Sequence, residues 1–103
     1  MENFIFVYIT CSLKKEAKKV ARHLIDEHLI VCGNIFPIES FYRWDGKVKH
    51  GKEYVLLGKT KEENYEKIVN EVEKIHSYTT PCVIKIPVSV NEKYGDWMKK
   101  ELL

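Results

Sequence analysis

The chain has 103 residues, which is near the commonest size of a single domain, and 45% of them are hydrophobic. Lys and Arg number 17 while Asp and Glu number 15, so the formal net charge is only +2. A balance this close argues against the basic surface that nucleic-acid-binding proteins present. We therefore expect one globular domain over residues 1–103 that has no nucleic-acid partner.

The N-terminal apolar run, residues 3–10, is too short for a membrane span and lacks the basic start of a signal peptide. The three cysteines, Cys11, Cys32 and Cys82, are odd in number, and no two of them have C-x-x-C spacing. Structural disulfides and a zinc site of closely spaced cysteines are therefore not expected. These features predict a cytoplasmic protein with free thiols and no membrane partner.

The first two expected elements are a strand and a helix. Residues 3–10 form a nearly unbroken apolar run, which is typical of a strand buried on both faces. Ser12 can then cap a helix over residues 13–28. The apolar residues of this helix recur on one side, namely Ala17, Val20, Ala21, Leu24 and Ile25.

A long hairpin is expected next. Residues 30–44 are rich in β-branched and aromatic side chains and show no helical periodicity, so they predict a strand. Asp45-Gly46 is the strongest short signal for a two-residue turn of type I′. The return strand should cover residues 47–59, with Gly51 as a candidate for a bulge.

A second helix should follow the hairpin. Thr60 and Glu63 have the spacing of a capping box, which marks the beginning of a helix. Apolar residues again recur with helical spacing, so the helix should end near residue 75. Its buried stripe is expected to contain Tyr65, Ile68, Val69, Val72 and Ile75.

The last third of the domain should contain a loop, a strand and a short helix. Residues 77–81 are typical of a loop, and residues 82–90 alternate like a strand. Pro87 inside that strand favours a position at the edge of the sheet. Asn91 can cap a C-terminal helix that carries Tyr94, Trp97 and Met98 on one side.

The order β-α-β-β-α-β predicts an α+β ferredoxin-like sandwich, with a long hairpin and a short C-terminal helix. Hairpin strands of about 12 residues span roughly 40 Å, whereas a helix of about 15 residues spans about 22 Å. The end of the hairpin should therefore overhang the helices. Exposed aromatic ribbons aggregate unless another copy covers them, so we expect a homo-oligomer paired through residues 34–59. The aromatic residues concerned are Phe36, Phe41, Tyr42, Trp44 and Tyr54.

No local signature of an active site is present in the sequence. Nucleophilic catalysis needs a nucleophile, a base and an orienting group that converge in space. None of the cysteines or histidines stands in a known catalytic signature, and a glycine-rich phosphate loop is absent. We therefore expect a protein that is not an enzyme. His76 stands apart from the other histidines, because it ends the second helix and opens the loop over residues 77–81.

Several motifs follow one another along the chain: Leu29-Ile30-Val31-Cys32-Gly33-Asn34, Phe41-Tyr42-Arg43-Trp44-Asp45-Gly46-Lys47, Leu57-Gly58-Lys59-Thr60, His76-Ser77-Tyr78-Thr79-Thr80-Pro81 and Tyr94-x-x-Trp97. Taken together and in this order, they resemble the CutA family of divalent-cation tolerance proteins. The resemblance implies a ferredoxin-like subunit in a tight homotrimer, related in architecture to the PII signalling proteins. It also implies a role in tolerance of copper and other divalent cations.

The resemblance also implies where a copper ion could bind. Members with a proposed copper site use a cysteine near the end of the first strand and paired histidines in the late loop. Here His76 matches one histidine and Ile75 replaces the other, while Cys11 lies two residues after the cysteine position, which Ile9 occupies. Copper accepts thiolate and imidazole ligands, so the candidate metal ligands are His76, Cys11 and Cys32.

Two further hypotheses remain open. One is a PII-like regulator that binds a small polar ligand in clefts between subunits. Aromatic side chains beside one acid and one lysine can hold such a ligand, although packing at an interface is the commoner role of such residues. The other hypothesis is a trimer with a purely structural or partner-binding role. The candidate cleft residues are Tyr42, Trp44, Glu53, Lys59 and Tyr78.

Overall fold

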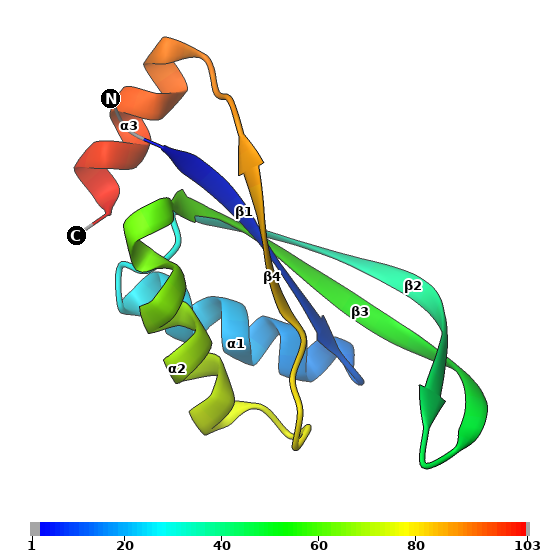
Figure 1. The fold of residues 1–103 in the computed structure, drawn as a ribbon. Helices are drawn as coiled ribbons and strands as arrows, with labels where there is room; N and C mark the ends of the chain where they lie inside the picture. Colours follow the sequence, from blue (N-terminus) through cyan, green and yellow to red (C-terminus); the bar gives the residue numbers. More distant parts are fainter. Residues whose placement is uncertain (1–2, 103) are drawn as a thin grey trace.

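The structure is a computed structural model that describes residues 3–102. Helices α1 and α2 cover one face of a four-stranded sheet, and the hairpin of β2 and β3 extends away from them (Figure 1). The predicted order of elements and the additional C-terminal helix are confirmed. The elements are β1 (Phe4–Cys11), α1 (Lys14–Asp26), β2 (Cys32–Trp44), β3 (Lys47–Lys61), the 3-10 helix η1 (Glu62–Asn64), α2 (Tyr65–Ile75), β4 (Val83–Val88) and α3 (Glu92–Glu101).

The sheet has the strand order β2-β3-β1-β4, and every neighbouring pair is antiparallel. Strand β4 therefore lies at an edge, as Pro87 predicted. Its apolar side chains Ile84 and Ile86 stand opposite Tyr8 and Phe6 of β1, on the face that the helices leave uncovered. The uncovered face of the sheet is thus apolar at its β4 edge.

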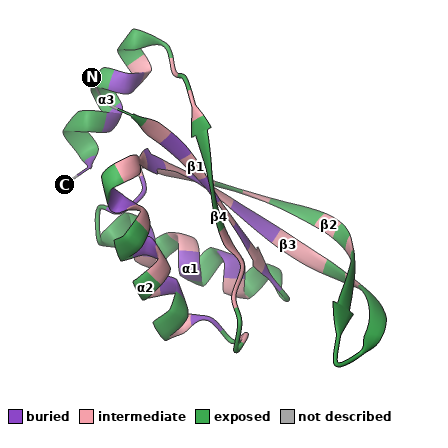
Figure 2. Cartoon of the chain, in the orientation of Figure 1, coloured by how far each residue is buried: buried purple, intermediate pink, exposed green. Residues whose placement is uncertain are grey.

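The core lies between the helices and the covered face of the sheet (Figure 2). Alternate residues of β1 are fully buried, because they point toward the helices, while their neighbours are only partly buried. Helices α1 and α2 contribute most of the apolar stripes that their periodicity predicted. Ile25 is the exception, because it is 41% exposed and lies beside the buried stripe of α1 rather than within it. Within residues 3–102, no helix is both long and apolar enough to cross a membrane. The core includes Ile5, Val7, Ile9, Cys11, Ala17, Val20, Leu24, Ile30, Leu56, Ile68 and Val72.

The hairpin turn is of type I′, since Asp45 and Gly46 have φ angles of 53° and 75°. The register between β2 and β3 is unbroken, so Gly51 pairs with Ser40 and forms no bulge. Strand β1 pairs with β3 only as far as Tyr54, and the rest of the hairpin overhangs. The overhang is exposed in Figure 2 and gives the chain its longest extent of 45 Å, against 23 Å and 21 Å.

The predicted cap of the first helix was wrong. Helix α1 begins at Lys14 after an extended Leu13, and no side chain caps it. The backbone carbonyl of Leu13 accepts the N–H of Ala17, which is the first hydrogen bond of the helix. The helix ends at Asp26, two residues earlier than expected, because His28 adopts a left-handed φ of 57° that ends the helical path.

The capping box of the second helix was also wrong. Thr60 still belongs to β3, and its hydroxyl donates a hydrogen bond of 2.6 Å to the carbonyl of Leu29. The side-chain amide of Asn64 donates to the Thr60 hydroxyl at 3.2 Å. Both side chains are buried. They provide hydrogen-bond donors for the carbonyl of Leu29 in the loop after α1, and not acceptors for the N–H groups in the first turn of α2.

Candidate functional site

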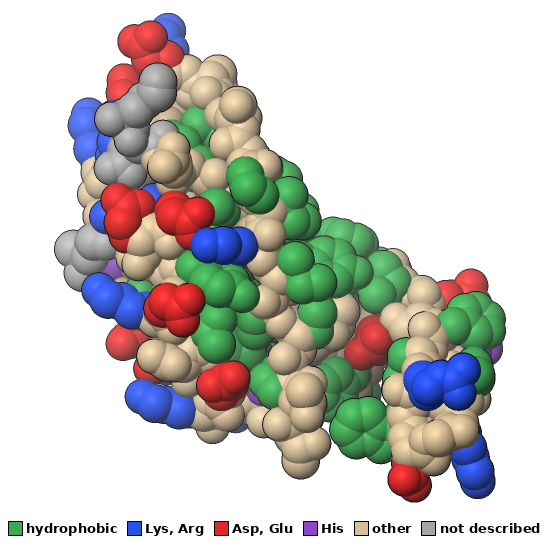
Figure 3. Space-filling view, viewed as in Figure 1, with side chains coloured by type: hydrophobic (Ala, Val, Ile, Leu, Met, Phe, Trp, Pro, Cys, Tyr) green, Lys and Arg blue, Asp and Glu red, His purple; other side chains and the backbone are tan. Residues whose placement is uncertain are grey.

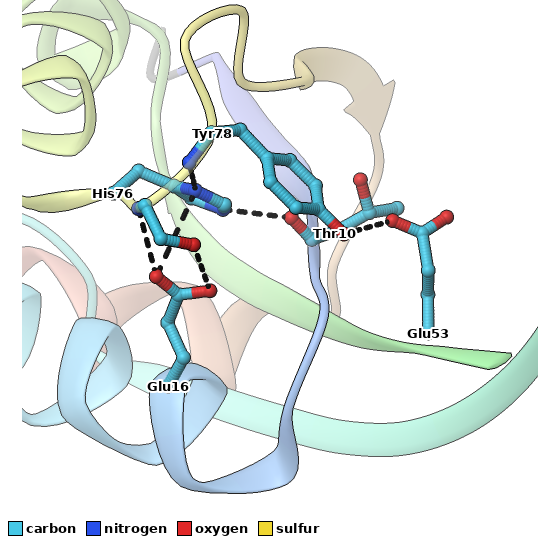
Figure 4. Close-up of polar contacts among 6 residues, drawn as sticks. Thr10, Glu16, Glu53, His76 and Tyr78 are labelled. Carbon is cyan, nitrogen blue, oxygen red and sulfur yellow. Dashed lines mark hydrogen bonds and ion pairs between the residues drawn. The ribbon is translucent and has the colours of Figure 1, made fainter. Parts of the chain in front are cut away.

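Two adjoining features gather where the end of β1, the overhanging hairpin and the loop after α2 meet. The first consists of Cys11, Glu16 and His76, which we call the His76 cluster. The second is a cavity between the hairpin and the loop, which we call the hairpin cavity. Tyr78 belongs to the loop and connects the two, because it contacts His76 on one side and Glu53 on the other (Figure 4).

The imidazole of His76 is completely buried and hydrogen-bonded at both nitrogens. Its Nδ1 accepts the backbone N–H of Tyr78 at 3.0 Å, so this nitrogen carries no proton. Its Nε2 lies 2.8 Å from the carbonyl oxygen of Thr10, so this nitrogen is the donor. The neutral Nε2–H tautomer satisfies both contacts, and it fixes the loop after α2 to the end of β1.

Glu16 in the first turn of α1 holds the same loop from the other side. Its carboxylate accepts the backbone N–H of Ser77 at 2.8 Å and the Ser77 hydroxyl at 3.1 Å. One carboxylate oxygen lies 3.9 Å from Nδ1 of His76. Partial burial raises the pKa of Glu16, but the hydrogen bonds from Ser77 lower it by more, so the net shift is below the usual value.

Cys11 completes the cluster as a protonated thiol. Its sulfur, a carboxylate oxygen of Glu16 and a ring nitrogen of His76 lie within 4.8 Å of one another. Burial, together with the negative charges of Glu16 and Glu53, raises the pKa of Cys11 to about 12. At neutral pH this thiol is therefore protonated and is not a thiolate nucleophile.

The structure brings together two of the three predicted metal ligands. Cys11 and His76 meet beneath the helices, whereas Cys32 lies on the opposite face of the sheet. This follows from the register, because Cys32 pairs with Lys59 and both alternate away from the helices. Glu16, rather than Cys32, is the third potential ligand. No local pattern in the sequence marks it, because only the folded chain brings it close to His76.

The hairpin cavity has a volume of about 620 Å³, within the range of small-molecule sites. Four of the five predicted cleft residues line it. Lys59 does not, because it lies near the other end of the sheet, where its Nζ is 5.6 Å from the centre of the Tyr94 ring. The lining residues are Thr10, Ser40, Phe41, Tyr42, Trp44, Glu53, Ser77, Tyr78, Thr79, Thr80 and Cys82.

Glu53 and Tyr78 form the polar centre of the cavity. The Tyr78 hydroxyl donates a short hydrogen bond of 2.6 Å to one carboxylate oxygen of Glu53 (Figure 4). Burial and the adjacent carboxylate both raise the pKa of Tyr78, so its hydroxyl remains a donor at neutral pH. Within residues 3–102, no Lys, Arg or His lies within ion-pair distance of Glu53.

Comparison with known proteins decides the family. Residues 5–101 match the family model described as CutA1 divalent ion tolerance protein. The chain belongs to the CutA1 family. A divalent-cation tolerance protein CutA from Archaeoglobus fulgidus is 40% identical over 94 residues, which is 90% of this chain and 92% of the relative. The family resemblance of the sequence is thereby confirmed.

Solved CutA structures share the whole fold of this chain. A crystal structure of CutA1 from Pyrococcus horikoshii has a TM-score of 0.92 and 35% identity, covering 96% of this chain and 98% of that one. CutA1 from Oryza sativa has a TM-score of 0.93 and 37% identity, covering 98% and 94%. The mixed α+β fold with a four-stranded antiparallel sheet is therefore the fold of the CutA family.

Replacing Glu16 by glutamine should change how stability depends on pH. The lowered pKa of Glu16 means that its carboxylate stabilises the fold above its usual pKa of about 4.5, and that this contribution is lost as pH falls through the lower value of the folded state. Thermal unfolding of wild type and Glu16→Gln should therefore differ most at neutral pH and converge in acid. Glu92→Gln, an exposed change on α3, serves as the control. A difference that stays constant into acid would contradict this role of the Glu16 charge.

Proposed function

We propose that the chain acts in divalent-cation tolerance as a homotrimer that is not an enzyme. Membership of the CutA1 family over residues 5–101 carries the proposal, and the name of the relative from A. fulgidus supports it. The site is consistent with a binding protein. Its nearest approach to a nucleophile and base is the pair Cys11 and His76, and there the thiol is protonated and both ring nitrogens are hydrogen-bonded.

The exposed apolar surface supports assembly into an oligomer. On the uncovered face of the sheet, Ile84 and Ile86 are 49% and 39% exposed. On the overhanging hairpin, Phe41 is 72% exposed and Trp44 is 53% exposed. Large exposed apolar patches of this kind mark interaction sites. The number of three subunits is what the family resemblance implies, and these two surfaces are the ones we propose to be buried.

The His76 cluster does not fit a resident copper ion in its present state. A copper ligand at Nδ1 of His76 would have to displace the backbone N–H of Tyr78, and Cys11 would have to lose its proton. Each carboxylate oxygen of Glu16 also accepts a hydrogen bond from Ser77, which a metal ion at that oxygen would have to share. We therefore do not propose copper as a cofactor at this cluster, and regard divalent cations as the stress to which the protein responds.

The free thiols support the cytoplasm as the proposed location. Cys11 is buried, and Cys32 and Cys82 are partly buried, with no disulfide among them. Reduced cysteines are typical of proteins in a reducing compartment. A solved CutA structure from A. fulgidus is described as periplasmic, which is a property of that protein.

Growth of a bacterial host that lacks its own CutA protein tests the proposed function. Expression of this chain should restore growth at raised copper or zinc concentrations, relative to an empty vector. The assembly variant Ile86→Asp should restore growth less well if the oligomer is the working form. Accumulation of the folded wild-type protein without any gain in growth would refute the role in tolerance.

A second candidate function is the binding of a small molecule in the hairpin cavity. The observation that favours it is the meeting of Tyr42, Trp44, Glu53 and Tyr78 around one cavity, although they come from two separate parts of the sequence. Mostly apolar cavities with a few converging polar groups are the usual form of ligand sites. The two functions are compatible, since a regulatory ligand can act in the tolerance response.

A further inference from the structure

We propose that the hairpin cavity binds a small organic cation, in which an ammonium or guanidinium group contacts Glu53 and the aromatic side chains around it. This inference rests on the second candidate function, because it names the chemical class of the ligand for the same cavity. It is carried by the carboxylate of Glu53, by the aromatic lining and by the absence of lysine and arginine from that lining.

The first step concerns the carboxylate of Glu53, which is half-buried and has one hydrogen bond from the Tyr78 hydroxyl. The lining contains no lysine or arginine, and the ion pairs of residues 3–102 do not include Glu53. A carboxylate withdrawn from water is costly unless a positive group faces it. Its second oxygen is therefore placed to accept hydrogen bonds from a cationic ligand.

The second step concerns the aromatic side chains of the hairpin. Phe41, Tyr42 and Trp44 line the cavity and are largely exposed in the single chain, so in the proposed trimer these rings would separate the cavity from a neighbouring subunit. Figure 3 shows hydrophobic side chains on both sides of the hollow between the end of the hairpin and the rest of the chain. The faces of aromatic rings attract cations, and a ring beside a carboxylate is a common arrangement for binding ammonium and guanidinium groups.

The third step excludes an anionic ligand. A phosphate or nucleotide ligand would need arginine, lysine or a helix N-terminus, and the lining supplies none of these. The carboxylate of Glu53 already acts on the groups around it. Burial raises the pKa of Tyr78 most, and the hydrogen bond to Glu53 and the negative charge of Glu53 raise it further. Thr10 and Thr79 also line the cavity, and a threonine hydroxyl can accept a hydrogen bond from an N–H group.

Calorimetric titration of the assembled protein tests the proposal with three probes, choline, agmatine and 1,4-diaminobutane. The neutral partner of choline is 3,3-dimethylbutan-1-ol, which has the same shape without the charge. We expect at least one cation to bind with a dissociation constant below about 1 mM, and 3,3-dimethylbutan-1-ol to bind at least about tenfold more weakly than that cation. Glu53→Gln should weaken cation binding by at least about tenfold, because the amide can still accept the Tyr78 hydrogen bond but carries no charge.

Glu92→Gln is the matched control, since it makes the same chemical change on the exposed surface of α3, and it should leave binding unchanged. Trp44→Leu tests the contribution of the aromatic lining and should also weaken binding of the cation. Equal affinity for a cation and its neutral counterpart, or no effect of Glu53→Gln, would overturn the proposal. Binding of a neutral or anionic molecule in a thermal-shift screen would overturn the cation class while retaining the cavity as a ligand site.

The cationic group could also come from a lysine or arginine of a neighbouring copy. In that case no probe would bind, and Glu53→Gln would dissociate or destabilise the assembly in light scattering. That result would overturn the small-molecule proposal and leave the role in cation tolerance untouched. An assembly that keeps its mass while Glu53→Gln loses binding of the cation would support the small molecule.

Discussion

Replacing His76 by alanine is expected to lower the free energy of unfolding by about 3–5 kcal/mol, because two buried hydrogen bonds are lost and a cavity is left. The carbonyl of Thr10 and the N–H of Tyr78 would both lose their partner in a buried site. The loop after α2 would then be held by the hydrogen bonds of Ser77 to Glu16 and of Tyr78 to Glu53. Urea unfolding at a fixed protein concentration measures the effect, since assembly makes stability depend on concentration.

His76→Gln separates a structural role from a metal-binding role. Glutamine can restore one of the two hydrogen bonds, so its loss of stability should be clearly smaller than that of alanine. Calorimetric titration with copper should give the same result for wild type and His76→Gln, because both nitrogens of His76 are already hydrogen-bonded in a buried site. A wild-type copper site that disappears in the folded His76→Gln protein would contradict the structural role and favour a metal site.

Replacing Ile86 by aspartate is expected to dissociate the assembly. Ile86 lies on the uncovered face of β4, where the proposed trimer would bury it. A buried, unpaired carboxylate costs several kcal/mol, and the trimer would carry this cost at each of its subunits. Sedimentation of the variant should therefore show mainly the mass of one chain.

Ile25→Asp on α1 is the matched control for this change. Ile25 is 41% exposed, close to the 39% of Ile86, but it lies on a helix that covers the other face of the sheet. The same substitution there should leave the assembly intact. Equal behaviour of the two variants, whether both remain assembled or both dissociate, would contradict the use of the β4 face as the interface.

Elements with a strong local pattern could be predicted from the sequence. The apolar run of β1, the stripes of α1 and α2, and the Asp45-Gly46 turn each depend on near neighbours, and all are present in the structure. Pro87 placed β4 at an edge because a proline cannot donate to a second strand. The overhang followed from strand and helix dimensions alone.

The side-chain partners could not be predicted, because they depend on contacts between distant segments. Ser12 and Thr60 have the residue type of a helix cap, yet Thr60 bonds to Leu29, thirty-one residues earlier. Glu16 belongs to the His76 cluster only because α1 and the loop after α2 meet in the fold. Lys59 lies far from the hairpin cavity because β3 extends well beyond it. The strand carries Lys59 to the other end of the sheet, beside Tyr94.

The mass of the wild-type protein in solution tests most directly whether the single chain is the working unit. Static light scattering at micromolar concentration should give three times the chain mass of 12.2 kDa, as the CutA resemblance and the exposed apolar surfaces predict. A mass of 12.2 kDa, unchanged as the protein is concentrated, would contradict the trimer and leave the overhanging aromatic hairpin without its proposed purpose.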